Sequence, residues 1–295
     1  MATKTSTSTS TKNPVGPSSP GASRPEPDEF GNYPLAGGDG HAYVPRPLGG
    51  FKNDVEGLRA LSDLGIHVLL LGEPGCGKTA LLRAAHPDAE NEIGHSKLTA
   101  WDMLWRPRPT EEGGIVFDPS PLTRAVMNGV PFYMDEIMRS SEDALTPLFS
   151  AMDGRGFIVG GNLDGTDLPI TPGFSVIAAS NPLVRGAFLP DAIASRFHIL
   201  TVDVSDDLLE KLGIDGRLRT IRANLAARDG GDTWRPSVRE LLAAQRFLDL
   251  GNMPQAAYSL VGWRVPARDR AAVAAVVSTV LGQRFKHPEW GGTIA

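Results

Sequence analysis

The sequence predicts an α/β fold, in which a parallel sheet lies between two layers of helices (αβα), followed by a small all-helical domain. The apolar run Val68–Leu71 has the length of a buried parallel strand, and it leads into a glycine-rich turn and an Ala/Leu-rich helix. Further apolar runs, the first within Ala89–Leu98, alternate with helical periods as far as Val202. Gly65 is expected to close one helix, and Ser120 and Gly129 to begin and end another. From Ser205 onward only helical periods recur. We therefore expect a disordered Ser/Thr/Pro/Gly-rich tail over 1–40, an αβα domain over 41–203 and a helical domain over 204–295.

The first strand ends in the pattern G-x-x-x-x-G-K-T, from Gly72 to Thr79, which is typical of a phosphate-binding loop. Its glycines let backbone N–H groups approach phosphate oxygens without a Cβ in the way, and Lys78 adds a catalytic positive charge at the β- and γ-phosphates. A glycine-rich turn with a chance Lys-Thr pair is the alternative, but it leaves the flanking strand and helix unexplained. The motif predicts a P-loop NTPase with ATP contacts from Gly72, Glu73, Pro74, Gly75, Cys76, Gly77, Lys78, Thr79 and Ala80.

Two acidic residues, Asp135 and Glu136, end the apolar run that begins at Val130. An Asp-Glu pair after a strand is common by itself, but downstream of a phosphate-binding loop it is the Walker B pattern. We expect Thr79 and Asp135 to hold a Mg²⁺ ion beside the bound nucleotide. Glu136 is then the catalytic residue that orients the attacking water. The expected cofactors are ATP and Mg²⁺.

Two further residues are candidates for catalysis. Asn181 ends the apolar run that begins at Phe174, and the carboxyl ends of strands are where α/β sheets bind ligands. Asn181 is therefore expected to position the water or the γ-phosphate, and an Asn-Pro turn is the secondary alternative. Arg196 precedes the apolar strand 198–202. It is either a surface charge or an arginine finger that stabilises the phosphoryl group transferred on a neighbouring subunit.

The helical part contains one cation in an unusual place. A helix begins in the stretch Trp234–Leu242, with Ser237 as its expected cap, which puts Arg239 in the first turn. A positive charge there opposes the helix dipole, which suggests that Arg239 reaches the nucleotide. An ordinary exposed arginine is an equal alternative. Helical periods recur near 206–212, 217–228, 236–249, 253–261 and 266–284.

Two segments between the expected core elements are predicted to form hairpins or loops. Residues 99–117 contain two tryptophans, two prolines and a Gly-Gly turn, and residues 155–168 contain a turn at 160–165. Within the first, the basic and aromatic stretch Trp105–Arg108 is either a packed hairpin or a loop that contacts a substrate. Before the first core helix, Tyr43 and Val44 are candidates for adenine contact or for a simple edge strand.

Composition limits the partners. A net charge of −5 argues against a strong field for polyanions, so nucleic acid is not the expected partner, and no apolar run has the length of a membrane span. The single cysteine, Cys76, excludes an intrachain disulfide and fits a cytoplasmic protein. It is either a small filler residue or a thiol beside the nucleotide whose alkylation abolishes turnover.

The order and spacing of these motifs resemble the AAA+ ATPases, and within them the MoxR-like group that includes the CbbQ and GvpN types. The resemblance covers about residues 41–285. The chain departs from the group at Met138, where these relatives often have Asn, and in its Ser/Thr-rich tail. The resemblance rests on Gly72–Thr79, Phe117–Ala125, Met134–Ile137, Leu148–Gly156, Asn181–Pro182 and Leu189–Phe197.

The resemblance implies an ATP-hydrolysing remodelling ATPase that acts on a protein client as a ring, usually a hexamer, with ATP at the subunit boundaries and a helical lid. Asn181 would be sensor 1, Arg196 the arginine finger and Arg239 the sensor 2 arginine. The segments 99–117 and 155–170 would face the pore or the client. A von Willebrand-type partner would be a separate protein. A nucleic-acid motor that uses Arg106 and Arg108, and a nucleotide-gated scaffold, remain as alternatives.

Overall fold

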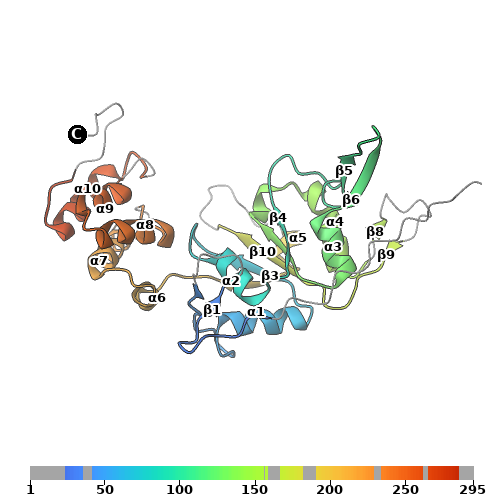
Figure 1. Ribbon diagram of the computed structural model, residues 1–295, viewed down its shortest axis with the longest axis horizontal. Helices are drawn as coiled ribbons and strands as arrows, with labels where there is room; N and C mark the ends of the chain where they lie inside the picture. Colours follow the sequence, from blue (N-terminus) through green and yellow to red (C-terminus); the bar gives the residue numbers. More distant parts are fainter. Residues whose placement is uncertain are drawn as a thin grey trace, which may run out of the picture.

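The computed structural model describes residues 24–35, 42–155, 157–158, 167–181, 191–228, 234–261 and 265–285. Figure 1 shows a sheet flanked by helices and, beside it, a separate group of helices that follows in the chain. The expected fold class is confirmed: an α/β domain with a parallel sheet precedes a set of C-terminal helices.

The central sheet has five strands in the order β11-β3-β10-β7-β4, and every neighbouring pair is parallel. Because both faces of such a sheet are covered by helices, its inner strands are apolar except for Asp135 and Ser180 at their carboxyl ends. The second strand along the chain is shorter than the expected run over 89–98, because turns follow it as far as residue 104. The strands are β3 (Val68–Leu71), β4 (Glu90–Ile93), β7 (Phe132–Asp135), β10 (Val176–Ser180) and β11 (His198–Thr201).

Alternate side chains of the strands enter two different cores. Val68 and Leu70 pack with α1 (Asp54–Asp63) and α2 (Lys78–Ala85), whereas Leu69 packs with helices of the other face. Those helices are α3 (Pro121–Asn128), the 3₁₀ helix Ile137–Arg139 and α4 (Glu142–Met152). The short helix α5 (Asp191–Ala194) precedes β11.

Local signals in the sequence fix several helix ends. The Ser120 hydroxyl accepts a hydrogen bond from the Thr123 N–H at 3.2 Å, and Pro121 takes the first turn of α3. Gly129, with φ 64°, ends the same helix in the left-handed conformation. Gly65 closes α1 in the same way with φ 68°. These ends agree with the sequence.

Two antiparallel hairpins lie outside the central sheet. The first, β5 (Trp105–Pro109) with β6 (Ile115–Pro119), projects from the domain, as the hairpin prediction for 99–117 requires (Figure 1). The second pairs β8 (Phe157–Ile158) with β9 (Asp167–Leu168), and the turn predicted at 160–165 lies outside the described residues.

The segment 24–35 differs from the expected disorder of residues 1–40. Strand β1 (Tyr33–Pro34) pairs with β2 (Ala42–Tyr43), and the Tyr33 side chain is fully buried. Its hydroxyl donates to Glu56 of α1 at 2.7 Å. Arg24 donates to Asp63 at the end of the same helix at 2.8 Å. Overall composition predicted a tail, but burial of one aromatic side chain offsets part of the ordering entropy here.

The C-terminal helices have a core of their own. Buried side chains from all five described helices, including Leu209, Leu218, Leu241, Leu260 and Val273, form one apolar cluster. No strand lies among the described residues of this part, and no helix in the described chain is both long and apolar enough to span a membrane. The helices are α6 (Asp206–Lys211), α7 (Gly216–Ala226), α8 (Val238–Asp249), α9 (Met253–Val261) and α10 (Arg270–Leu281).

Candidate nucleotide-binding site

The glycine-rich loop follows the central strand β3 and leads directly into α2. Gly75 and Gly77 have φ angles of 74° and 101°, a backbone conformation that other residues rarely adopt. At Gly72 a Cβ would come within 2.6 Å of the Val202 carbonyl oxygen and 2.7 Å of the Cys76 sulfur. The loop therefore needs glycine at these positions, and α2 begins with its N–H groups facing the loop.

The Lys78 ammonium lies beneath this loop. It donates to the Gly72 carbonyl at 2.8 Å and to the Glu73 carbonyl at 3.1 Å. The buried Cys76 thiol lies next to it, at 3.8 Å from the Lys78 nitrogen. A cation held among loop carbonyls is placed to exchange those partners for phosphate oxygens. The thiol is at the position that the alkylation hypothesis requires, but it is covered.

Tyr133, which was not predicted as a site residue, lies near both expected Mg²⁺ ligands, Thr79 and Asp135. The Tyr133 hydroxyl lies 3.4 Å from the Thr79 hydroxyl, and the Asp135 carboxylate is near enough to act on its pKa. Burial, with the nearby Asp135 carboxylate, raises the pKa of Tyr133 well above its usual value, so the phenol keeps its proton. Tyr133 and Asp135 alternate along β7, which puts both on one face of the sheet. The spacing of two residues between Tyr133 and Asp135 was the signal in the sequence that could have identified Tyr133 as a site residue.

The described residues contain no cluster of three or more His, Cys, Asp or Glu side chains that would hold a metal by protein ligands alone. A hydroxyl and a carboxylate beside a phosphate site suit Mg²⁺, which usually takes one or two protein ligands together with phosphates and water. Thr79 and Asp135 fit that donor set.

Glu136 has a left-handed backbone, with φ 54° and ψ 38°, and is the one non-glycine residue with positive φ in the described chain. Such a conformation costs about 1 kcal/mol or more, and it is found where function requires a particular side-chain direction. The Glu136 N–H donates to the Asp135 carboxylate at 2.9 Å. Gly94 packs against the Glu136 carbonyl, and a Cβ there would collide with it. The side chain stays 39% exposed, with Arg139 at 3.8 Å.

Asn181 lies at the same edge of the sheet as the loop and the acids. It follows β10, the strand between β3 and β7, and the Gly72 N–H bonds the carbonyl of the preceding Ser180 at 3.3 Å. The parallel topology thus brings Lys78, Thr79, Asp135, Glu136 and Asn181 to one edge.

Arg196 lies elsewhere. It precedes β11, whose first residue His198 pairs with Val68 at the start of β3, so Arg196 is at the opposite edge of the sheet from the loop. Its guanidinium binds both oxygens of Asp153 at 2.9 and 3.0 Å and lies 5.1 Å from the ring centre of Phe149. The structure therefore separates Arg196 from the loop of its own subunit.

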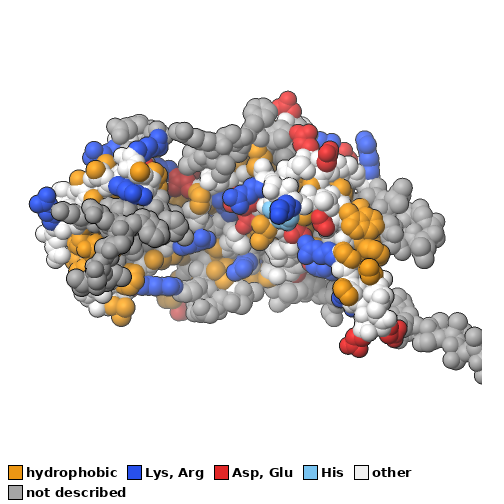
Figure 2. Space-filling view, turned by 90° about the horizontal axis from the view of Figure 1, so that it is seen from above, with side chains coloured by type: hydrophobic (Ala, Val, Ile, Leu, Met, Phe, Trp, Pro, Cys, Tyr) orange, Lys and Arg blue, Asp and Glu red, His pale blue; other side chains and the backbone are white. Residues whose placement is uncertain are grey.

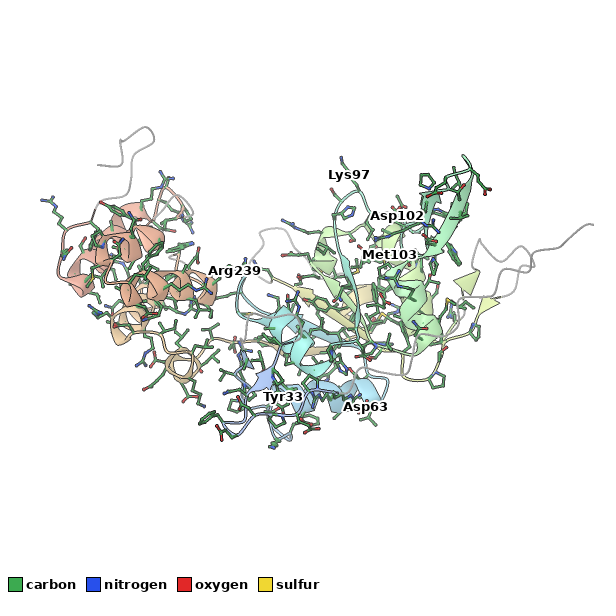
Figure 3. All side chains as sticks on the ribbon, viewed as in Figure 1. Tyr33, Asp63, Lys97, Asp102, Met103 and Arg239 are labelled. Carbon is green, nitrogen blue, oxygen red and sulfur yellow. The ribbon has the colours of Figure 1, made fainter. Side chains whose placement is uncertain are left out.

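Residues of the helical part contact the loop. The Glu73 carboxylate accepts hydrogen bonds from Arg222 of α7, at 3.1 Å, and from Arg235. A Cβ on Gly75 would lie 3.3 Å from the Cβ of Arg239. Figure 3 shows Arg239 at the end of the helical part that faces the sheet. The sequence predicted that Arg239 lies near the nucleotide site, but it did not predict that Arg222 and Arg235 contact the loop.

A cavity of about 290 Å³ lies between the loop and the helical part. Its walls combine apolar side chains, from the residues after β11 and from α6 and α7, with charged side chains. Such a mixture suits a purine base. Of the two alternatives for Tyr43, the structure shows the strand: Tyr43 lies in β2, is buried and donates to Asp54 at 2.5 Å. The cavity is lined by Glu73, Val202, Asp203, Val204, Asp206, Leu209, Arg219, Arg222, Ala223, Ala226 and Arg235.

Arg46 is a further loop contact that sequence reasoning missed. It donates to the Cys76 carbonyl, and its guanidinium nitrogen lies 3.2 Å from where a Cβ on Gly77 would be. Asp54 holds it from the other side at 3.5 Å. The segment before α1 therefore supports the loop, although nothing in its composition marks it.

The hairpin β5–β6 has paired arginines and exposed apolar side chains. Arg106 is paired with Glu92, and Arg108 is paired with Asp118 at 2.6 Å. Ile115 and Phe117 are exposed, and Figure 2 shows apolar side chains gathered at this end of the molecule, with Lys and Arg spread among other side chains over the same face. The face in view carries no continuous basic groove.

Comparison with known proteins identifies the domain. Residues 67–197 match the family model described as AAA domain (dynein-related subfamily). This range begins just before β3, ends just before β11, and contains every predicted site residue except Arg239. Over these residues the chain is thus similar to an AAA domain, in agreement with the resemblance to the AAA+ ATPases that the motifs indicated.

Among its relatives, Protein NorQ of Paracoccus denitrificans is 34% identical over 121 residues, which are 39% of this chain and 43% of NorQ. Uncharacterized protein SH1500 of Staphylococcus haemolyticus is 33% identical over 162 residues, 52% of this chain and 61% of that protein. The chain spans about half the length of these curated relatives. A crystal structure from Cytophaga hutchinsonii superposes with a TM-score of 0.43 and 17% identity, over 77% of this chain and 87% of that chain, a likeness that carries no argument.

Proposed function

We propose that this protein is a Mg²⁺-dependent ATPase that remodels a protein client in the cytoplasm. It would work as a ring, which in the AAA+ ATPases is usually a hexamer. The observation that carries the proposal is the convergence of Lys78, Thr79, Asp135, Glu136 and Asn181 at one edge of the parallel sheet. A phosphate-binding loop, two Mg²⁺ ligands and a strained acidic residue at one edge are the parts that phosphoryl transfer to water requires.

In this mechanism the loop N–H groups and Lys78 bind the phosphates, and the Tyr133 hydroxyl keeps the Thr79 and Asp135 oxygens together. Mg²⁺, when bound, neutralises charge on the phosphates. The carboxylate of Glu136 accepts a hydrogen bond from the attacking water and orients it toward the γ-phosphorus, and Asn181 holds the γ-phosphate or that water. Arg239 reaches the terminal phosphates from the lid, and the cavity beside Glu73 holds the adenine.

The position of Arg196 supports the proposed ring. Because it lies at the sheet edge opposite its own loop, it would stabilise transferred phosphate only at a neighbouring subunit's site. For the client we favour a protein, which a separate von Willebrand-type partner would help to recruit. The net charge of −5 argues against a nucleic-acid motor, whereas the exposed side chains of Ile115 and Phe117 offer apolar contacts for a protein.

Mixing two inactive variants tests the proposal. Glu136→Gln should bind ATP but turn it over very slowly, and Arg196→Ala should also lose turnover. In a mixed ring, an Arg196→Ala subunit keeps its own Glu136 and receives Arg196 from a Glu136→Gln neighbour, so part of the activity should return.

Arg217→Ala is the matched control, because it removes a partly exposed arginine that is paired with Asp215 inside the helical part. It should leave turnover unchanged. ATPase activity should also rise per subunit as protein concentration rises. Full turnover by Glu136→Gln would refute the ATPase mechanism, and full turnover by Arg196→Ala, or by a monomer of the wild type, would refute the ring.

A further inference from the structure

The phosphate-binding loop contains an acidic side chain that phosphate binding does not need. A carboxylate beside the phosphates of ATP is unfavourable unless a cation compensates it, because like charges repel at short range. Glu73 stands in this place, and two cations compensate it. Arg222 and Arg235 both donate to its carboxylate, one to each oxygen.

Both arginines come from the helical part of the chain. Arg222 lies on α7, and Arg235 lies in the segment that leads into α8. Arg222 also donates to the Pro236 carbonyl, so it ties Glu73 and this segment into one unit. Its side chain is 9% exposed and that of Glu73 is 20% exposed. Pairs this sheltered are screened less by solvent than surface pairs.

The charge on Glu73 is maintained against burial. Burial alone would raise the pKa of its carboxyl group, but the hydrogen bonds and charges of Arg235 and Arg222 outweigh burial and hold the pKa below its usual value. The carboxylate is therefore ionised at neutral pH and stays attached to both lid arginines.

The position of α8 on the loop follows from these contacts. Ser237 begins α8 with a capping box to Glu240, which fixes its first turn. The Ser237 hydroxyl and the Arg239 Cβ both lie 3.3 Å from where a Cβ on Gly75 would be. A short segment of the lid, 235–239, thus lies along loop residues 73–75, held by the ion pairs at one end and by close packing at the other.

We propose that Glu73 is a positioning residue: by pairing with Arg222 and Arg235 it fixes the start of α8 on the phosphate-binding loop, so that Arg239 reaches the terminal phosphates of ATP. The inference rests on the proposed function and deepens it, because it assigns to the side chain of Glu73 a contact with the lid in place of a contact with the nucleotide.

The test compares ATP with ADP, because Arg239 acts on the terminal phosphate. Dissociation constants for both nucleotides with Mg²⁺ are measured in a Glu136→Gln parent, which does not consume ATP. Adding Glu73→Gln should weaken ATP binding by about tenfold and ADP binding less, since the coupling between two contacts is typically worth about 5-fold to 150-fold. Arg239→Ala should give the same preference for ADP. The two changes together should add nothing further, since Glu73 acts through Arg239.

Arg217→Gln is the matched control. Arg217 lies on α7 five residues before Arg222, but it pairs with Asp215 inside the helical part and is not among the residues that line the cavity. Its loss should leave the ratio of ATP to ADP affinity unchanged. If Glu73→Gln fails to fold, Arg235→Gln and Arg235→Lys carry the same test from the lid side, with Lys restoring most of the ratio.

Several outcomes would overturn the inference. If Glu73→Gln leaves the ratio of ATP to ADP affinity unchanged, the ion pairs of Glu73 do not position Arg239. If Glu73→Gln weakens ATP binding as much in an Arg239→Ala background as without it, Glu73 acts by another route. Tighter binding of both nucleotides would mean that Glu73 merely repels phosphate. A parent that binds no ATP would overturn the proposed function itself, and the inference with it.

Discussion

Mild acid should destabilise the αβα domain through one buried histidine at the end of the phosphate-binding helix. His86 follows α2 directly and is 3% exposed. Burial lowers its pKa from 6.5 to about 4, with a further lowering by Arg24, while the Leu58 backbone and Asp63 act in the opposite direction. The ring is therefore neutral in the folded protein at neutral pH.

The direction and size of the effect follow from this shift. Because the folded pKa lies below the unfolded one, the unfolded chain takes up the proton first. The stabilisation is complete above pH 6.5 and is lost as the pH falls toward about 4. The difference, 6.5 − 4, corresponds to about 3 kcal/mol in full, of which about 2 kcal/mol is lost between about pH 7.5 and pH 5.

The assay is urea unfolding at these two pH values, for the wild type and for His86→Gln, whose side chain is neutral at both. The variant should lose most of the pH dependence. A smaller part should remain, because burial also lowers the pKa of His67. Paired carboxyl groups such as Asp63 have pKa values below 3.8 and act at lower pH. An equal pH slope in wild type and variant would refute the reasoning.

Two further predictions concern the loop and its metal ligands. Tyr133→Phe removes the hydroxyl between Thr79 and Asp135, so the Mg²⁺ concentration for half-maximal ATPase activity should rise about threefold, as loss of one hydrogen bond implies; an unchanged Mg²⁺ titration would contradict this. Gly77→Ala, at φ 101° and against Arg46, should weaken ATP binding and destabilise the fold by about 1–2 kcal/mol. Gly213→Ala, at φ 72° in open space, should show a similar strain in thermal unfolding but normal ATP binding, and equal binding losses in both would argue against a local effect.

The parts of the fold that the sequence predicted are those with local causes. Ser120 and Gly129 end α3 through contacts within a few residues, and the loop from Gly72 is fixed by its own glycines. Strand β4 came out shorter than predicted because the turns after it depend on Gly94 packing under Glu136, a contact across more than forty residues of chain. The catalytic and binding roles assigned to the site residues stay predictions.

Features that depend on distant side chains had no sequence signal. The positive φ of Glu136 is imposed by its surroundings and not by its residue type, since glutamate disfavours that conformation. Arg222 is 149 residues from Glu73 in the chain, and a charged residue on a helix is usually solvated. The burial of Tyr33 depends in the same way on α1, which lies beyond it in the sequence.

The placement of Arg196 and the phosphate-binding loop at opposite edges of one sheet gives each subunit a direction. Two kinds of contact can join the arginine of one subunit to the loop of another. A twofold interface completes two sites at once and ends at a dimer, whereas head-to-tail contacts propagate until a rotation closes them into a ring or leaves an open spiral. In the proposed ring, one sheet edge would therefore be the donor face and the other the acceptor face. Loss of Asp153, which binds the Arg196 guanidinium, should then damage the site of the neighbouring subunit while the subunit's own site stays intact.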